Sequence, residues 1–440
     1  MASGTTDSKS RGDWILGLLE HMFTRLPDGT DKLAAVLHRL AGNSSQKPVV
    51  DNLFPKRLLD FARLSHKVSI VNIADGTPNL PPDDDMALPA GLATALAEYL
   101  ARLAQQVEAI DARADALVAQ CRQMLSGGKR HRAALAYWSY LAHGGQLTND
   151  AIFRLGAALE LFQASALFHD DLLDNSDLRR GLPTAHRAFT TRHQQMGLAG
   201  NAMKFGSNAA ILLGDITLSL AYVALDDASI ISELPASQAA LARQYFAAMC
   251  QEVMIGQYLD ILLENTPITD DIPANRARTV ISAKSASYSA RYPLLLGAIL
   301  AGAAANQLEQ LSIIGEQLGI AFQLRDDVLG VYGDSATTGK PTGADLREGK
   351  RTELLLQTLS NANQSERTEL AQIIGKPELT ASELARARDL MENTGALAAV
   401  EQQIAALGND ALQQLAALPL AEPGRRQLLA LAKSLTSRDA

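Results

Sequence analysis

The segment ALELFQASALFHDDLLDNSDLRRG, residues 158–181, joins an apolar run to a dense cluster of charges. Apolar residues dominate its first twelve positions, and four aspartates then fall within the eight positions 170–177, ahead of Arg179 and Arg180. Carboxylates crowded at the end of a buried helix repel one another and resist desolvation unless a cation lies among them. The segment therefore predicts a buried helix that ends in a cation-binding cluster, with two arginines available to an anionic ligand.

The composition of the 440 residues favours helices. Hydrophobic residues make up 47% of the chain and aromatic residues only 5%, so Ala and Leu supply most of the apolar content. Ala and Leu suit helices, whereas strands prefer β-branched and aromatic residues. Residues 88–435 show Ala- and Leu-rich helical patterns and no two-residue alternation long enough to predict a sheet. The sequence thus predicts an all-α bundle of about ten or more helices.

A Gly-, Pro- and Asp-rich stretch, ADGTPNLPPDDDM at 74–86, indicates a boundary near the N-terminus. Three amphipathic segments precede this stretch, so residues 1–86 are predicted to form a helical N-terminal extension with a linker. Residues 87–440 are predicted to form the main domain. The pattern does not indicate what the extension does.

Charge and cysteine content narrow the range of functions. The chain carries 48 acidic and 40 basic residues, a net charge of −8, and no concentrated basic run, so nucleic-acid binding is not expected. Cys121 and Cys250 form no CxxC spacing, which indicates a reducing compartment. The apolar stretch 292–305 is shorter than the roughly 20 residues that span a bilayer. We therefore expect a cytoplasmic protein without a transmembrane segment.

A second carboxylate pair occurs in the same kind of context. DDVLG, residues 326–330, continues directly from the apolar segment IIGEQLGIAFQLR. In a helix, Asp170 and Asp174 share one face with Asp171 alongside, so both clusters can present several carboxylate oxygens. Clusters of oxygen ligands suit Mg²⁺, which keeps waters and accepts substrate phosphates as further ligands. Two such pairs on similar apolar helices predict a magnesium-dependent site.

Basic residues complement these clusters. GGKRHR at 127–132 places Lys129 and Arg132 on one face of a helix start, and Lys284 opens the segment KSASYSARYP. Lys340 and Lys350 frame GKPTGADLREGK, a Gly- and Pro-rich stretch typical of a mobile loop. Arginine matches phosphate oxygens in two-point contacts, and lysine adds compact charge. The set therefore predicts a site for two diphosphates, one bridged through Mg²⁺ and one held directly by basic side chains.

At this level of detail the sequence resembles the trans-polyprenyl diphosphate synthases, the head-to-tail prenyltransferases. The resemblance extends over roughly residues 88–360 and rests on motifs in family order: GGKRHR, FQASALFHDDLLDNSDLRRG, GSNAAILLGD, EVMIGQYLD, KSASYSARYPLLLGA, FQLRDDVLGVYGD and GKPTGADLREGKRT. It implies a helix bundle around a deep central cavity and a homodimer. It also implies an enzyme that condenses isopentenyl diphosphate with an allylic diphosphate, using two or three Mg²⁺ ions per site.

The resemblance also implies residue roles. The catalytic residues would be Asp170, Asp171, Asp174, Lys284, Asp326 and Asp327. Of these six residues, the metal ligands would be Asp170, Asp171, Asp174 and Asp326. Arg179, Lys284, Gln323, Lys340 and Lys350 would assist in binding the allylic diphosphate, and Ser285 would be a further substrate-binding residue. Isopentenyl diphosphate would be held by Lys129, Arg132, Gln163 and Arg180.

Two positions depart from the family pattern. Gly330 stands where the second motif usually ends in a third carboxylate, with Asp334 four residues further on. Ser285 stands where threonine is common after the lysine, and its hydroxyl is retained. The first departure bears on how Mg²⁺ would be held at the second motif.

Product length should depend on the side chains upstream of Asp170, because the chain would grow beside that helix. Ser165 and Ala166 are small, and Phe162 lies one further turn away as a candidate floor of the cavity. These residues predict a geranylgeranyl (C20) product, with C25 or longer as an open alternative.

Two alternative functions belong to other classes of protein, a terpene cyclase and a non-catalytic regulatory subunit. A terpene cyclase would share the first motif but should carry an Asn/Asp–Ser/Thr–Glu motif where this chain has DDVLG. A non-catalytic regulatory subunit of a heteromeric synthase would lose the first aspartate motif or the basic residues, and this chain keeps both. Gly330 is the one feature that favours the subunit.

Overall fold

The computed structural model describes residues 90–146, 150–231, 234–268, 272–333, 342–376 and 378–436. These residues belong to one unit of the chain, Asn79–Ala440. The predicted N-terminal extension, residues 1–86, lies outside the described residues, as do Lys340 and Asp334. The division of the chain at residue 86 therefore stays a prediction.

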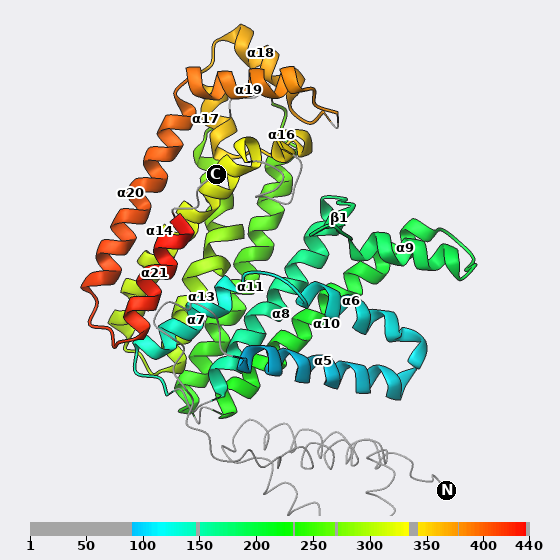
Figure 1. The fold of residues 1–440 in the computed structure, drawn as a ribbon, viewed down its shortest axis with the longest axis vertical. Coiled ribbons are helices and arrows are strands. Elements are labelled where there is room, and N and C mark those ends of the chain that lie inside the picture. The colour runs from blue at the N-terminus through cyan, green and yellow to red at the C-terminus, as the bar shows by residue number, and fades with distance from the viewer. Residues whose placement is uncertain are drawn as a thin grey trace, which may run out of the picture. The chain divides into compact units, whose positions relative to one another are not determined.

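The described residues are almost entirely helical, which confirms the predicted all-α class (Figure 1). The first half of the unit contains α5 (Gly91–Ile110), η1 (Ala112–Ala114), α6 (Asp115–Leu125), α7 (His131–Ala142), α8 (Ala151–Leu173), α9 (Ala185–Gln195), α10 (Ala202–Ile231) and α11 (Ala236–Glu264). The second half contains α12 (Asn275–Val280), η2 (Ile281–Arg291), α13 (Tyr292–Leu300), α14 (Ala305–Tyr332), α16 (Ala344–Glu348), α17 (Glu353–Asn361), α18 (Gln364–Ile373), α19 (Ala381–Asn393), α20 (Ala396–Ala417) and α21 (Gly424–Thr436).

Helix α8, which carries the first aspartate motif, is embedded in the bundle. It packs most extensively against α10 and also against α7. Small residues on α8, Ala157, Ala158 and Ala164, are fully buried, so neighbouring helices can approach closely. The helix ends at Leu173, and Asn175 then adopts a left-handed φ of 52°. The aspartates consequently occupy the last turn of a helix whose body is fixed by packing.

Segment η2 is an 11-residue π-helix that carries Lys284 and Ser285. Three helical glycines face its backbone: Gly256 on α11, and Gly315 and Gly319 on α14. A Cβ on any of them would lie under 3.0 Å from backbone atoms of η2. These glycines therefore let α11 and α14 pack tightly on both sides of η2. The sequence pattern did not predict a π-helix, although such helices occur frequently at functional sites.

The only strands among the described residues form a small hairpin, β1 (Leu178–Arg179) and β2 (Leu182–Pro183). They pair antiparallel, with Leu178 opposite Pro183 and Arg179 opposite Leu182. Both central residues of the turn have positive φ, 53° at Arg180 and 76° at Gly181, which is the type I′ geometry of tight hairpins. Strands of two residues are too short to produce a detectable alternation, so the sequence pattern does not predict this hairpin.

The C-terminal helices build a second core around the end of α14. Buried side chains of α14 pack there with those of α17, α19 and α20. Arg325 of α14 forms an ion pair with Glu401 of α20 (2.6 Å), and Arg278 of α12 pairs with Glu353 of α17 (2.8 Å). Helices α16–α19 thus gather beyond one end of α14 (Figure 1). Lys350, which follows α16, lines the same cavity as Asp326 and Asp327 of the second aspartate motif.

Three helices in the described part of the chain are long and apolar enough to cross a membrane by length and composition: residues 151–173 of α8, 202–230 of α10 and 236–264 of α11. The prediction rested on the uninterrupted apolar stretch 292–305, whereas these three helices carry polar residues among their apolar ones. The apolar window of α8 is 72% buried, against 39% for α10 and 33% for α11. The expected absence of a transmembrane segment is therefore not confirmed, and α10 and α11 expose apolar surface.

Candidate active site

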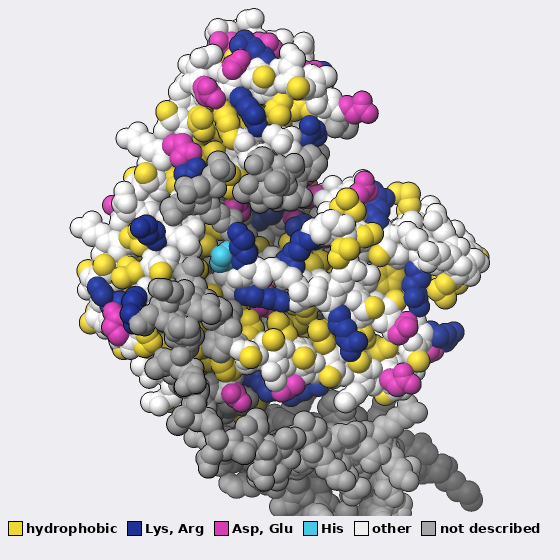
Figure 2. Space-filling model, viewed as in Figure 1, with side chains coloured by type: hydrophobic (Ala, Val, Ile, Leu, Met, Phe, Trp, Pro, Cys, Tyr) yellow, Lys and Arg dark blue, Asp and Glu magenta, His cyan; other side chains and the backbone are white. Residues whose placement is uncertain are grey.

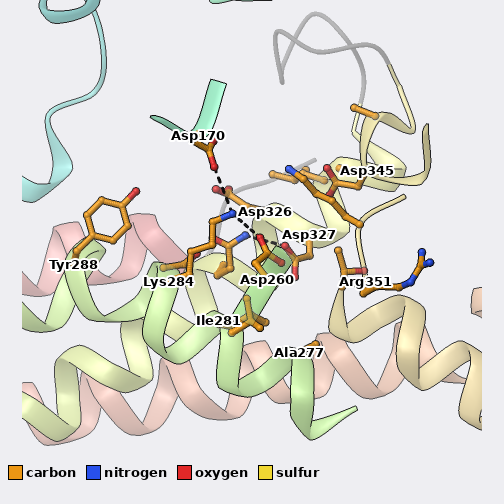
Figure 3. Close-up of a pocket in the computed structure, with 18 of the residues that line it drawn as sticks. Asp170, Asp260, Ala277, Ile281, Lys284, Tyr288, Asp326, Asp327, Asp345 and Arg351 are labelled. Atoms are coloured by element: carbon orange, nitrogen blue, oxygen red, sulfur yellow. Dashed lines mark hydrogen bonds and ion pairs between the residues drawn. The ribbon is translucent and has the colours of Figure 1, made fainter. Parts of the chain in front are cut away.

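A cavity of about 690 Å³ lies where α8, α11, η2, α14 and α16 meet. Figure 3 shows its side chains directed toward one another from these separate elements. On the face drawn in Figure 2, Lys and Arg side chains border a hollow in the molecule. The charged residues that line the cavity are Lys129, Asp170, Asp260, Lys284, Asp326, Asp327, Asp345, Lys350 and Arg351.

Lys284 lies between carboxylates of two other helices. Its Nζ is 2.5 Å from Asp260 Oδ2 on α11 and 3.4 Å from Asp170 Oδ1 on α8 (Figure 3). Burial alone would lower the pKa of Lys284, but Asp170 and Asp260 outweigh it and raise that pKa above its usual value. Lys284 is therefore a fixed cation at the centre of the cavity.

The first aspartate motif divides between two cavities. Asp170 lines the large cavity, and Asp174 interacts electrostatically with Asp170 and Lys284 on the same side. Asp171 is 1% exposed and faces a smaller cavity of about 150 Å³. There it accepts hydrogen bonds from Arg179, at 2.7 Å from Nε and 2.5 Å from Nη2. Asp170 and Asp174 thus interact with each other, while Asp171 is paired with an arginine.

The second aspartate motif occupies the end of α14. Asp327 is 7% exposed and accepts a hydrogen bond from Gln323 Nε2 at 2.8 Å. Lys350 pairs with Glu348 at 3.0 Å and also interacts with Asp345 and Asp174. Gln323, Ser285 and Lys350 all line the large cavity, as Lys284 does. Arg179 lines the smaller cavity, but its Nη2 is 3.5 Å from Asp170 Oδ2.

Carboxylates in and near the cavity destabilise one another's charged forms. Burial and the charge of Asp170 raise the pKa of Asp174 to about 6. Burial and the charge of Asp345 raise the pKa of Asp327 to about 8. Burial and the charge of Asp260 raise the pKa of Glu264 to about 7. A divalent cation among these oxygens would favour their ionised forms, so the residues present fit Mg²⁺.

The ligands are not already assembled around one point. Within the described ranges, no three His, Cys, Asp or Glu side chains are grouped closely enough to hold a metal ion by themselves. Mg²⁺ usually takes only one or two carboxylates and completes its shell with water and substrate phosphate. The separated arrangement is therefore compatible with ions that bind together with a diphosphate.

The arginines behind the first motif owe their position to the hairpin and to two glycines. Arg180 lines the smaller cavity with Arg179, and its Nη1 donates to Met124 O at 3.4 Å. Its guanidinium packs against Gly127 and Gly128, where a Cβ would lie 3.0 Å or less from the Nη atoms. The double glycine of GGKRHR thus makes room for an arginine that lies 52 residues after Gly128.

The remaining residues predicted for isopentenyl diphosphate are more dispersed. Lys129 lines the large cavity. Arg132 lines neither cavity: its Nη2 donates to Ser289 Oγ at 2.9 Å, and its guanidinium lies 4.2 Å from the centre of the Tyr288 ring. Gln163 lies on α8, about two turns before Asp170. The structure therefore does not gather these side chains around one cavity.

Phe162 is buried beneath the cavity rather than in its lining. Its ring packs edge to face against Tyr288 of η2, with 5.9 Å between the ring centres, and against Phe246 of α11, with 6.1 Å between the ring centres. Tyr288, by contrast, lines the cavity. Ser165 is buried and Ala166 is partly buried on the same helix. Phe162 thus packs against Tyr288, a residue that lines the cavity, and does not line the cavity itself.

Several lining residues were not predicted. Asp260 belongs to the motif EVMIGQYLD, but no role was assigned to it. A carboxylate at the end of a long apolar helix is the same signal that identified Asp170 and could have identified Asp260. Asp345 and Tyr288 carry no such local signal, because their positions depend on how α16 and η2 pack.

Comparisons with known proteins agree with this geometry. Residues 114–391 match the model of the polyprenyl synthetase family. The chain belongs to the polyprenyl synthetase family. It is 33% identical over 268 residues to geranylgeranyl diphosphate synthase of Sulfolobus acidocaldarius, covering 61% of this chain and 74% of that protein. It is 29% identical over 309 residues to geranylfarnesyl diphosphate synthase of Aeropyrum pernix, covering 70% and 88%.

Solved structures of similar proteins also belong to prenyl diphosphate synthases. A geranylgeranyl pyrophosphate synthase of Corynebacterium glutamicum, complexed with isoprenyl diphosphate and magnesium, superimposes with a TM-score of 0.73. It is 36% identical, and the match covers 80% of this chain and 100% of that one. The chain is therefore a polyprenyl diphosphate synthase with the fold of its family. Its relatives make products of different lengths, so the comparisons leave the product of this synthase open.

Proposed function

We propose that this synthase condenses isopentenyl diphosphate with an allylic diphosphate, head to tail, and that its main product is geranylgeranyl diphosphate (C20). The observation that carries the proposal is the large cavity, where two aspartate motifs from α8 and α14 face Lys284 and Lys350. Carboxylates with raised pKa values beside fixed cations suit a magnesium-bound diphosphate.

The residues have distinct roles in the proposed reaction. The allylic carbon–oxygen bond breaks, and its electron pair leaves with the diphosphate. Lys284 and Lys350 are fixed positive charges next to the leaving group and stabilise the charge that develops on it. Bound Mg²⁺ would add further positive charge at the same oxygens. We assign its ligands to Asp170, Asp171, Asp174 and Asp326, and expect two or three ions.

The second substrate supplies the new bond. The alkene of isopentenyl diphosphate attacks the allylic cation, and the adduct then loses a proton, for which the expelled diphosphate is the nearest proposed acceptor. Lys129, Arg132, Gln163 and Arg180 are proposed to hold isopentenyl diphosphate, with Arg179 between the two sites. Buried aromatic side chains beneath the cavity exclude water, which would otherwise quench the cation.

Product length is assigned from the helix that carries the first motif. Ser165 and Ala166 leave space upstream of Asp170, and Phe162 with its aromatic neighbours is proposed as the floor of the cavity. This arrangement favours a C20 product. A longer product remains the second candidate, because a relative that covers 70% of this chain makes geranylfarnesyl diphosphate.

We also propose that the synthase is a cytoplasmic homodimer. Neighbouring helices α10 and α11, which contact each other through Tyr222 and Phe246, expose apolar side chains. Those that are at least about half exposed are Met203, Leu212, Ile230, Met254, Ile255, Tyr258 and Leu262. A second copy of the chain would remove this apolar surface from water.

A product assay tests the proposal. The purified full-length chain would be incubated with Mg²⁺, isopentenyl diphosphate and, in separate reactions, C5, C10 and C15 allylic diphosphates. We expect diphosphate release that EDTA abolishes, and a C20 alcohol as the main product after dephosphorylation. Release with a longer main product would replace the C20 assignment. No release with any primer would favour the non-catalytic regulatory subunit.

A further inference from the structure

The loop between α6 and α7 ends in a residue with an unusual backbone conformation. Arg130, which directly precedes α7, has a left-handed φ of 54°. Among the described residues, the other non-glycine residues with a positive φ are Asn175 and Arg180. Such a conformation is rare for a residue with a side chain and persists only where neighbouring contacts enforce it. The contacts of the Arg130 side chain are therefore a place to look for a role beyond the local fold.

The guanidinium of Arg130 makes two contacts. Its Nη1 lies 2.6 Å from Oε2 of Glu160, in the middle of α8. Its Nη2 donates to the carbonyl of Leu125, the last residue of α6. Glu160 is only 6% exposed, so its carboxylate is withdrawn from water. Arg130 therefore ties the loop to α8 and supplies the positive charge that this buried carboxylate requires.

The same loop adjoins the residues proposed for isopentenyl diphosphate. Lys129 precedes Arg130 and lines the large cavity. The guanidinium of Arg180 packs against Gly127 and Gly128, the two glycines of the loop. Arg130 and Arg180 thus approach the loop from different elements, and each of them is a cation close to the same segment of backbone.

Glu160 acts on both arginines. Burial lowers the pKa of Arg180, the charges of Arg130 and Arg179 lower it further, and the charge of Glu160 opposes them. Without Arg130, Glu160 would be a buried carboxylate without its ion-pair partner, which is strongly unfavourable. Arg180 is a cation within the electrostatic range of that carboxylate, so it would be drawn toward Glu160 and away from a substrate diphosphate.

We propose that Arg130 is a positioning residue for the isopentenyl diphosphate site. It neutralises Glu160 and thereby leaves Arg180 at the two glycines, where Arg180 can bind the substrate. Neither Arg130 nor Glu160 is assigned a contact with substrate. The inference rests on the proposed function, because it concerns the proposed binding site of isopentenyl diphosphate. If the pair had only a structural role, its loss would change stability and leave substrate binding unchanged.

Steady-state kinetics of the full-length protein test the proposal. The KM for isopentenyl diphosphate is measured at a saturating allylic diphosphate, and the KM for the allylic diphosphate is measured separately. The variants are Arg130→Met, Arg130→Gln, Glu160→Gln and the double variant Arg130→Met/Glu160→Gln. Arg154→Met is the matched control, because Arg154 also pairs with a glutamate, Glu98 of α5, and lines neither cavity. Thermal melting identifies any variant that fails to fold.

We expect Arg130→Met to raise the KM for isopentenyl diphosphate about tenfold or more, the usual effect of losing a charge-assisted hydrogen bond to the ligand. Arg130→Gln should raise it less, because the amide still donates to Glu160 without neutralising it. The KM for the allylic diphosphate should change by less than about threefold in both variants.

Removal of the carboxylate should reverse the effect. The double variant should return to within about threefold of the wild-type KM for isopentenyl diphosphate, because no buried charge is left to attract Arg180. Its melting temperature should stay lowered, since the contact with Leu125 is still lost. Glu160→Gln alone and the control Arg154→Met should both keep a wild-type KM.

Three results would overturn the role of Arg130. One is a folded Arg130→Met variant with a wild-type KM for isopentenyl diphosphate. Another is a double variant that binds this substrate no better than Arg130→Met. The third is a tenfold higher KM in Glu160→Gln, and this outcome does not depend on whether the Arg130 variants fold. A wild-type protein that released no diphosphate would instead contradict the proposed function, so the two failures are distinguishable.

Discussion

Lys284 illustrates what single residues contribute to this site. Its position at the start of KSASYSARYP, taken together with the two aspartate motifs, predicted a cation for a diphosphate. The structure places its ammonium group between Asp170 and Asp260. The role of Asp260 was missed, because a residue twenty-four positions upstream becomes a partner only when α11 packs against η2. At the residue scale, the sequence thus predicted a charged diphosphate site, but it did not predict which charged side chains form ion pairs with one another.

Replacing Phe162 tests the proposed floor of the cavity. Phe162→Ala should shift the products toward longer chains, because it removes the aromatic ring beneath Tyr288 and opens space along α8. Chromatography of the dephosphorylated products from a fixed primer measures the shift.

Phe153→Ala is the control for this prediction. Phe153 lies on the same helix but stacks on Tyr137 at 5.9 Å, so its loss should leave the product distribution unchanged. If Phe162→Ala also left the distribution unchanged, Phe162 would have no role in chain length.

At the scale of elements, the helices were predictable and the local exceptions were not. The long apolar periodicities of α8, α10, α11 and α14 predict helices, because side-chain burial follows the helical repeat. The π-helix η2 and the β1–β2 hairpin depart from this pattern. Both are stabilised by neighbours distant in the sequence, and both carry proposed diphosphate-binding residues, Lys284 and Arg179.

The glycine contacts around η2 lead to a stability prediction. Gly256→Ala should lower the free energy of unfolding by about 1–3 kcal/mol, the usual cost of overpacking, because the new Cβ would meet Lys284 N and Cα under 3.0 Å. The displaced Lys284 should also reduce turnover. Chemical denaturation and the product assay measure the two effects.

Gly156→Ala provides the comparison. Gly156 is also helical, but its nearest neighbours are side-chain atoms of Leu92 and Ala133, at 3.1 and 3.4 Å. These side chains can adjust, and alanine is the better helix former, so this variant should be close to neutral. Equal stability of the two variants would argue against a tight η2 contact.

At the scale of the whole molecule, the exposed apolar side chains of α10 and α11 underlie the proposed homodimer. A double variant, Leu212→Asp/Tyr258→Asp, should shift the protein toward the monomer in size-exclusion chromatography with light scattering. The two carboxylates would have to be desolvated in the interface, which opposes association. Leu212 is 56% exposed and Tyr258 is 64% exposed in the single chain, so the change should not disturb the core.

Ile110→Asp is the matched control, because Ile110 is an exposed apolar residue at the end of α5, on a different helix. It should leave the oligomeric state unchanged. A wild-type protein that is monomeric, or a double variant that stays dimeric, would contradict the proposed interface.

The sequence by itself determined the helical class, the family and the two aspartate motifs, because helical periodicity and carboxylate spacing are local properties of the chain. Only the tertiary structure decided which charges share a cavity. It paired Asp171 with Arg179, brought Asp260 to Lys284 and filled the space beside Gly330 with Asp345. These contacts join helices far apart in the sequence, and their positions follow from packing around shared cores rather than from any local pattern.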